Sequence, residues 1–406
     1  MYEGVRPRLV NALLRPVERR TAVVATLFGV ALFCASASLP SVGLFDEEQV
    51  GDTPAYASYG DAIVDGEVPY RDFYVEYPPG ALPVFVVPAL GDRDGYATRF
   101  KILALVLGAA LVACVAWALA IARASTGHVA AAAALVGVAP AALGPVFLIN
   151  FDVWPAALAA AFVAATAWRR AVLAGALLGL AVAAKFFALV LAPLAFLYVR
   201  GRAAWRGALA AAAAVVLVFA PFAVLAPGAI GNNLLNLVRR PLQIESLGAS
   251  ILLAAHHLGA YDPTVNSDYN SQNLGGALAA AVATASGLAG LAVIAAIVVA
   301  FARRPWAVER FFVACAAALT ALVAFGKILS PQFLVWLVPL VALVPSAAAY
   351  GLLLAAMALT HVWFPSRYGQ LVALGDVSWI VLTRNVALLG LLAVLCLRLV
   401  RKPGPP

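Results

Sequence analysis

Nine carboxylates gathered within one short stretch are the residues of this sequence best suited to chemistry. Residues 41–80 hold nine of the 19 acidic residues of the 406-residue chain and one base, Arg71. The sequence becomes strongly apolar on both sides. A carboxylate can act as a general base toward a hydroxyl group within hydrogen-bonding reach. The nine candidates are Asp46, Glu47, Glu48, Asp52, Asp61, Asp65, Glu67, Asp72 and Glu76.

Basic residues farther along the chain could supply the complementary charge. Lys185, Arg239, Arg240 and Lys327 are separated from one another by apolar segments. Arginine and lysine side chains bind phosphate oxygens and stabilise the negative charge that grows on a leaving phosphate. A carboxylate base opposite such cations suits glycosyl transfer from a lipid phosphate to a hydroxyl group. A polytopic transporter could show the same polarity, so the residue types alone leave both classes open.

The elements that must position these residues are transmembrane helices. The chain is 64% hydrophobic and 11% charged, whereas soluble domains are about 45–50% apolar and about 25% charged. Apolar runs of roughly 20 residues are long enough to span a bilayer as helices. We therefore expect an all-α polytopic membrane protein that forms a single domain over residues 1–406. About twelve spans are predicted, near 21–40, 101–121, 129–148, 153–168, 171–184, 186–199, 207–225, 276–302, 311–326, 332–345, 347–363 and 379–398.

The distribution of charge predicts the orientation of these spans. The net charge of +8 does not indicate a nucleic-acid partner, because the bases lie at the ends of predicted spans. If the N-terminus is inside, the inner segments hold 17 of the 27 bases and three of the 19 acids, as the positive-inside rule requires. We expect a plasma-membrane protein with both termini cytoplasmic and large extracytoplasmic loops at 41–100 and 226–275. The first run, 21–40, is interpreted as a retained helix because no convincing signal-peptide cleavage site follows it.

Two segments near the predicted outer surface are harder to interpret. Residues 78–90 are apolar but contain four prolines, which deny a helix its backbone donors. We expect this segment at the outer interface of the membrane. If it spans the membrane instead, the assignment of the loops to the inner and outer sides fails. Lys185 lies between two short spans, where it could extend its ammonium group to the interface or meet a lipid phosphate. Both interpretations stay open.

Three motifs together resemble the GT-C fold glycosyltransferases, and within these the bacterial polyprenyl-phosphate-mannose-dependent enzymes of glycosyltransferase family 87. The motifs are DTPAYASYGDAIVDGEVPYRDFYVEYPPGALPVF (52–85), RRPLQIESLGASILL (239–253) and GKILSPQFLVWLVPL (326–340). The resemblance implies transfer of mannose, or in some members arabinofuranose, from a polyprenyl-phosphate donor at the outer face. It implies a cell-envelope glycan or glycolipid as acceptor, no cofactor, and a catalytic acid at the position of Asp52.

Other interpretations of the acidic stretch compete with this catalytic role for Asp52. Thr53 and Pro54 resemble a helix start, so Asp52 could instead cap that helix. Asp46 or Glu47 could be the base in its place. The run Asp46–Glu48 could also hold a divalent cation, but solvated acids are favoured there and we predict no metal site.

The remaining assignments follow from position. Gln332 and His361 are expected to line the pocket, and Glu76 and Tyr77 to position the first loop. His256 and His257 are expected to be structural, because adjacent helical residues do not share one ion well. Arg384, inside the last span, should pair with an acid or a carbonyl group. The predicted substrate-binding residues are Lys185, Arg239, Arg240, Gln243, Glu245, Lys327, Gln332 and His361.

Overall fold

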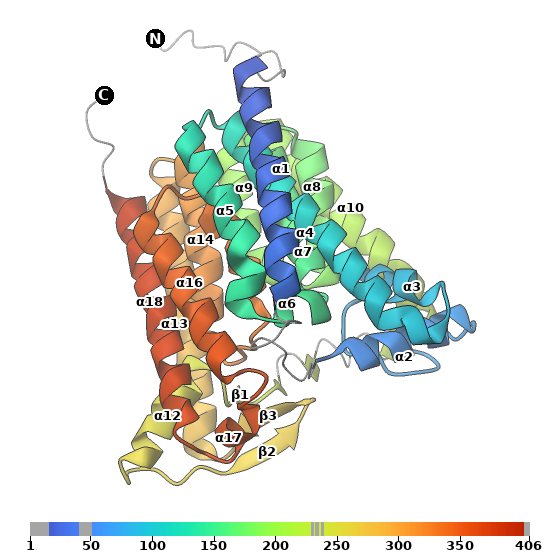
Figure 1. The fold of residues 1–406 in the computed structure, drawn as a ribbon, viewed down its shortest axis with the longest axis vertical. Helices are drawn as coiled ribbons and strands as arrows, with labels where there is room; N and C mark the ends of the chain where they lie inside the picture. The colour runs from blue at the N-terminus through green and yellow to red at the C-terminus, as the bar shows by residue number, and fades with distance from the viewer. Residues whose placement is uncertain (1–15, 40–50, 229–230, 232–234, 237–238, 402–406) are drawn as a thin grey trace.

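The computed structural model describes residues 16–39, 51–228, 231, 235–236 and 239–401 as a helical bundle with a small sheet at one end (Figure 1). Each of the twelve predicted spans overlaps a helix of the structure. This confirms the expectation of an all-α polytopic membrane protein.

Among the described residues, six helices are long and apolar enough to cross a membrane on length and composition alone. The helices that coincide with the other six predicted spans are shorter, so the full number of spans stays a prediction. The six long helices are α1 (Pro16–Ser38), α4 (Tyr96–Ile121), α5 (Thr126–Leu143), α10 (Gly201–Leu225), α13 (Ala277–Ala302) and α18 (Val377–Val400). The shorter ones are α7 (Val153–Ala167), α8 (Ala171–Ala184), η5 (Phe186–Leu191) with α9 (Ala192–Val199), α14 (Val308–Ala324), α15 (Phe333–Ala342) and α16 (Ala347–Trp363).

The bundle has an enclosed centre and an exposed periphery. Nearly all side chains of α14 and α15 are buried, whereas α10 and α13 are largely exposed. Helices that are apolar on every side and yet exposed suit contact with lipid. Small residues allow close approach within the bundle: a Cβ atom at Gly175 of α8 would lie 2.0 Å from the carbonyl oxygen of Gly207 in α10.

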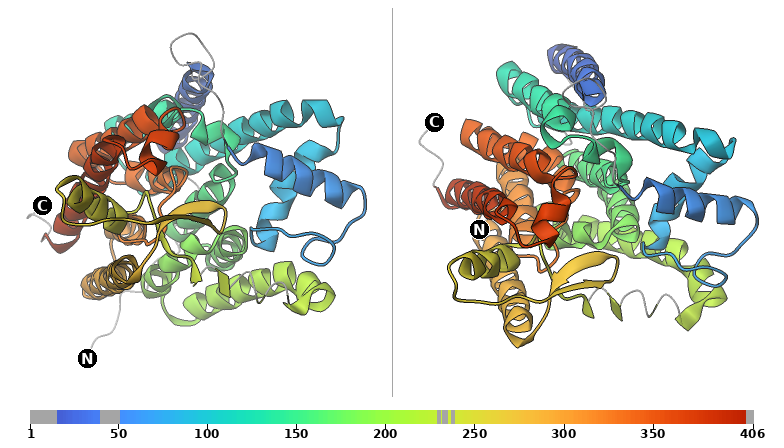
Figure 2. Two further views of the ribbon diagram at one scale, coloured as in Figure 1. Left: turned by 90° about the horizontal axis from the view of Figure 1, so that it is seen from below. Right: turned by 60° about the horizontal axis from the view of Figure 1, so that its bottom comes forward.

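The connecting segments separate to the two ends of the bundle. α1 begins and α18 ends at the same end (Figure 1). There Arg123 lies 3.6 Å from Glu18, and Arg200 lies over the Trp306 ring. The described parts of the two predicted extracytoplasmic loops both lie at the opposite end (Figures 1 and 2). Their elements are α2 (Thr53–Val64), η3 (Pro79–Ala81), α3 (Leu82–Ala89), η4 (Arg93–Gly95), β1 (Leu242–Gln243), α12 (Leu247–His257), β2 (Val265–Asp268) and β3 (Ser271–Leu274), with α6 (Val146–Ile149) and α17 (Tyr368–Val372) beside them.

A three-stranded antiparallel sheet in the second loop was not expected from the sequence. Its strand order is β1-β3-β2, with Leu242 opposite Leu274 and Asn266 opposite Asn273. The β2–β3 hairpin turns at Tyr269 and Asn270, whose φ angles are 55° and 54°. Positive φ at both central residues is the signature of the type I′ turn that favours tight hairpins.

The proline-rich segment 78–90 folds as η3 and α3 beside α2. α3 has only eight residues, about 12 Å at a rise of 1.5 Å per residue, so it is too short to cross a bilayer, as predicted. Gly80 rests directly on the end of α8, where an added Cβ atom would lie 2.5 Å from the Ala183 carbonyl carbon. The Gly80 carbonyl oxygen accepts a hydrogen bond from Trp154 Nε1 at 3.0 Å. This contact fixes the first loop next to Lys185.

Gly80→Ala should therefore destabilise the protein, because the new methyl group forces the first loop away from α8. Overpacking of this kind costs about 1–3 kcal/mol. The matched control is Gly127→Ala, since nothing lies within 4 Å of a Cβ atom at that helical position. Thermal unfolding of the purified variants measures the difference. Equal unfolding temperatures for the two variants would contradict the close contact.

Candidate active site

Asp52 stands directly before α2, but its side chain does not cap the helix. Its backbone is already helical (φ −81°, ψ −1°), and its carboxylate makes no hydrogen bond to the first turn. Oδ2 instead accepts hydrogen bonds from the hydroxyl groups of Tyr56 at 3.2 Å and Tyr77 at 3.1 Å. The capping interpretation is wrong, because the carboxylate is turned toward the tyrosines.

Aromatic packing fixes these two hydroxyl groups. Tyr56 is fully buried and stacks on Phe85 with ring centroids 4.5 Å apart. Tyr77 packs edge-on against Phe151 at 4.7 Å. Burial, with a smaller contribution from the Asp52 charge, raises the pKa of Tyr56 and of Tyr77 well above the usual phenol range. Both tyrosines are therefore neutral hydrogen-bond donors to Asp52.

Lys185 extends into the protein and pairs with an acid. Its Nζ atom donates a hydrogen bond to Asp152 Oδ1 at 2.6 Å. The same oxygen accepts a hydrogen bond from Trp336 Nε1, also at 2.6 Å. The interpretation in which Lys185 extends to the interface is wrong, since the ammonium group lies among aromatic rings with its side chain only 16% exposed. One of these rings is Tyr77, whose centroid is 5.9 Å from Nζ.

Arg240 joins the first and second large loops. Its Nη1 atom lies 3.5 Å from Glu76 Oε1, and its Nη2 atom donates to the Tyr269 carbonyl oxygen at 2.9 Å. Asn270, at the hairpin tip, donates to Glu76 Oε2 at 3.4 Å. Burial raises the pKa of Glu76, and the charge of Arg240 partly opposes this. Arg239 is exposed, so of the predicted pair only Arg240 is shown in contact with the first loop.

Lys327 lies close to Arg240 on a loop that Gln243 holds in place. Burial and the neighbouring Arg240 charge lower the pKa of Lys327. The Gln243 backbone N–H donates to the Lys327 carbonyl oxygen at 2.9 Å. Its side-chain Oε1 accepts from the Leu329 N–H at 2.9 Å, and its Nε2 donates to Ser330 Oγ at 3.0 Å. The side-chain amide of Gln243 is thus engaged with the loop that carries Lys327.

Glu245 is buried beside the last span. Its carbonyl oxygen accepts hydrogen bonds from Arg384 Nη2 at 2.8 Å and Asn385 Nδ2 at 3.3 Å, which confirms that Arg384 pairs with a carbonyl group. Burial, opposed by the Arg384 charge and a hydrogen bond with Tyr368, raises the pKa of Glu245 to about 8. These contacts anchor β1 and the second loop to α18.

The other predicted residues lie in different surroundings. Gln332 immediately precedes α15. The His361 ring packs against Gly144 at the end of α5, where a Cβ atom would lie 2.7 Å from its Nε2. His256 bonds the Tyr261 carbonyl oxygen and His257 bonds Ser378. The alternative bases and cation ligands Asp46, Glu47 and Glu48 lie outside the described residues.

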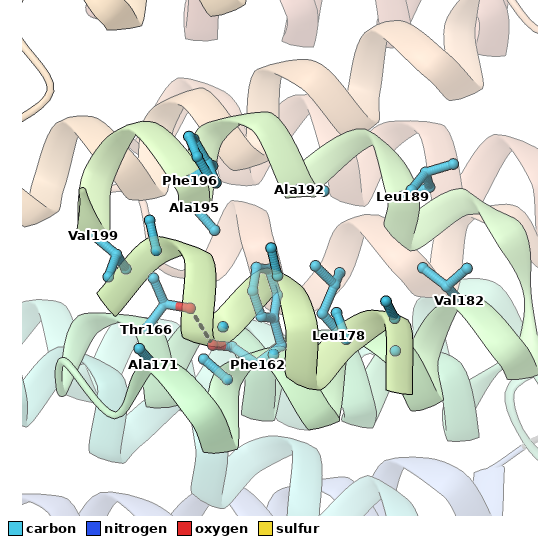
Figure 3. A pocket seen from close by; sticks show the side chains of 18 of the residues that line it. Phe162, Thr166, Ala171, Leu178, Val182, Leu189, Ala192, Ala195, Phe196 and Val199 are labelled. Carbon is cyan, nitrogen blue, oxygen red and sulfur yellow. Dashed lines mark hydrogen bonds between the residues drawn. The ribbon is translucent and has the colours of Figure 1, made fainter. Parts of the chain in front are cut away.

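An apolar groove of about 620 Å³ runs between α7, α8, α9 and α10 (Figure 3). Its lining extends from Thr166 and Val199 to Val182 and Leu189, which flank Lys185 in the chain. The Thr166 hydroxyl group is already bonded to the Phe162 carbonyl oxygen at 2.8 Å. The groove therefore presents a hydrocarbon surface that leads toward the Lys185 end of the bundle.

A comparison with protein families identifies the chain. The sequence profile of glycosyltransferase family 87 matches residues 74–331, more than half of its length. The chain belongs to glycosyltransferase family 87. This family 87 protein is accordingly a membrane glycosyltransferase, and the transporter alternative is set aside. The match includes Tyr77, Asp152, Lys185 and Arg240, and it begins after Asp52. A search of curated proteins found no match.

Sequence reasoning about this family 87 transferase missed two contributors to the Asp52 surroundings. Asp152 was not among the predicted site residues, and Tyr77 was expected only to position the first loop. One signal was available for Asp152: it and Lys185 stand at the same predicted end of neighbouring apolar helices, where buried opposite charges tend to pair. No local signal marked the Tyr77 hydroxyl group as a partner of Asp52.

Glu245→Gln should change how the stability of the transferase depends on pH. The folded protein retains a proton on Glu245 up to a pKa of about 8, whereas the unfolded chain releases it near the ordinary value. The unfolded state therefore binds fewer protons across this window, and the contribution of Glu245 to stability is lost as pH rises toward 8. The glutamine variant should gain stability relative to the wild type from about pH 5 to about pH 8. Thermal unfolding across this range tests it, with exposed Glu67→Gln as control; a constant difference would contradict the raised pKa.

Proposed function

We propose that this family 87 transferase moves mannose from a polyprenyl-phosphate donor to a hydroxyl group of a cell-envelope glycan or glycolipid. The reaction takes place at the outer face of the plasma membrane, with Asp52 as general base. The observation that carries the proposal is the position of the Asp52 carboxylate. It is held by two tyrosine hydroxyl groups, and one of these tyrosines also contacts the Lys185 ammonium group.

The arrangement around Asp52 suits a general base. Both tyrosines donate to Oδ2, and within the described part of the chain no hydrogen bond occupies Oδ1. A carboxylate oxygen oriented in this way can accept the proton of an acceptor hydroxyl group as that oxygen attacks the sugar. If the donor linkage is β and the product linkage α, the attack is a single in-line displacement with inversion, as the resemblance to the family implies.

The cations around Asp52 suit a phosphate leaving group. The charges of Arg240 and Lys185 both lower the pKa of Glu76, which adjoins Tyr77. Lys327 lies near Arg240. Positive groups in a water-poor site stabilise the charge that develops on the departing phosphate. The apolar groove toward Lys185 (Figure 3) suits the polyprenyl chain of the donor.

Asp52→Asn should abolish sugar transfer while leaving protein level and donor binding nearly intact, because the amide cannot take the proton. A loss of about 10²-fold or more is expected for a general base. The assay uses purified protein with synthetic polyprenyl-phosphate mannose, and in parallel polyprenyl-phosphate arabinofuranose, which compares the two donor sugars. Asp65→Asn, an exposed carboxylate of the same loop, is the matched control. Near-normal turnover by Asp52→Asn would move the base elsewhere.

Arg240→Ala should weaken binding of the lipid phosphate more than Arg239→Ala does. Arg240 is half-buried against Glu76, so its charge acts in a poorly solvated setting, whereas Arg239 is exposed and screened by water. The measurement is the Kd for polyprenyl phosphate and, separately, the KM for the acceptor. Equal donor affinities for the two variants would remove Arg240 from the phosphate site.

A further inference from the structure

The pair formed by Asp152 and Lys185 is the buried feature that the proposed reaction does not explain. The Asp152 side chain is 1% exposed and that of Lys185 16%. Asp152 precedes α7, and Lys185 lies between α8 and η5, so the pair joins separate elements. A buried ion pair is seldom more stable than apolar residues of similar volume, because both charges lose their hydration. Stability alone is therefore a weak reason for this pair.

The surroundings of the pair are built to hold an ammonium group at one point. The Lys185 Nζ atom lies 4.7 Å from the Phe151 ring centroid, 5.1 Å from that of Trp336 and 5.3 Å from that of Phe333. These three rings and that of Tyr77 form what we call the aromatic cage. Aromatic faces at such distances attract a cation. Trp336 additionally donates its Nε1–H to the Asp152 oxygen that Lys185 binds.

The cage leaves part of the ammonium group available. A lysine ammonium group has three N–H donors, and Asp152 is its one hydrogen-bond partner among the described residues. Asp152 itself is closed off from solvent, whereas Lys185 is partly open. Two N–H donors of the Lys185 ammonium group are therefore left for an anion.

The cage is also tied to the proposed general base. Tyr77 contributes its ring to the cage and its hydroxyl group to Asp52 Oδ2, 3.1 Å away. One side chain therefore contacts both the carboxylate and the ammonium group. A shift of Lys185 would change where a bound phosphate sits relative to Asp52.

We propose that Asp152 is a positioning residue that, with the aromatic cage, holds the Lys185 ammonium group toward the phosphate of the lipid donor. This inference rests on the proposed function for the identity of the donor. Asp152 acts through Lys185, so it has no separate contact with the sugar or the phosphate. Its removal should therefore act on phosphate recognition only while Lys185 is present.

The test compares two probes that differ in the phosphate group: farnesyl phosphate and farnesol, each bound to the full-length protein in lipid nanodiscs. The wild type should prefer farnesyl phosphate. Lys185→Met should remove the preference, and Asp152→Asn should reduce it by about tenfold or more, because a small displacement of a binding group weakens recognition strongly. In the Lys185→Met background, Asp152→Asn should cause no further loss. Asp65→Asn, the same change at the surface, should leave the preference unchanged.

Thermal unfolding of the same variants separates positioning from a purely structural role. Each single variant leaves one buried charge without its partner and should unfold at a lower temperature than the wild type. The double variant Asp152→Asn with Lys185→Met removes both charges and should regain much of this loss. It should nevertheless not regain the preference for phosphate. Trp336→Phe, which keeps the ring but removes the N–H donor to Asp152, should lower the preference less than Asp152→Asn.

The outcomes separate the inference from the function on which it rests. If the wild type binds both probes equally, the proposal of a lipid-phosphate donor is wrong, and the positioning role of Asp152 is overturned with it. If the wild type prefers the phosphate but Asp152→Asn retains that preference, only the positioning role is overturned. A further loss of preference in the double variant, compared with Lys185→Met alone, would likewise overturn it, since Asp152 would then act independently of Lys185.

Discussion

The separation of a carboxylate from a nearby ammonium group is the constraint on which this site depends. Asp52 and Lys185 carry opposite charges, and a direct ion pair would occupy both groups with each other. Tyr77 contacts both groups: its hydroxyl group donates to Asp52, and the Lys185 ammonium group lies over its ring. Asp152 supplies the buried counter-charge for Lys185. Asp52 and Lys185 thus each have their own hydrogen-bond partners, and among the described residues they do not pair with each other.

The bundle holds this separation from several sides. Gly80 brings the first loop onto the end of α8, next to Lys185. The second loop is anchored by the bonds from Arg384 and Asn385 to Glu245. It reaches the first loop through Arg240, whose partner is Glu76. Side chains from the first span region to the last therefore converge on one end of the bundle, which explains why the site is spread over the whole chain.

Much of the scaffold could be predicted from the sequence, because a membrane helix needs only a sufficiently long apolar run. The helices, the gathering of both large loops at one end and the short segment 78–90 followed from length, composition and charge. The β2–β3 hairpin did not, since strands of four residues carry almost no periodic signal. Asp52 was predicted from its motif, whereas its bond to Tyr77 and the pairing of Asp152 with Lys185 depend on contacts between distant segments. Local sequence patterns do not encode such contacts. The family match shows only which range of the chain is shared with the family, not which residues touch.

The groove between α7, α8, α9 and α10 bears on how the lipid chain of the proposed donor would be held. Its lining is hydrocarbon, and its Thr166 hydroxyl group is already occupied by a backbone oxygen. Such a surface contacts a bound lipid chain mainly through van der Waals packing. For the proposed polyprenyl-phosphate donor, most of the discrimination between donors would therefore reside in the phosphate and the sugar.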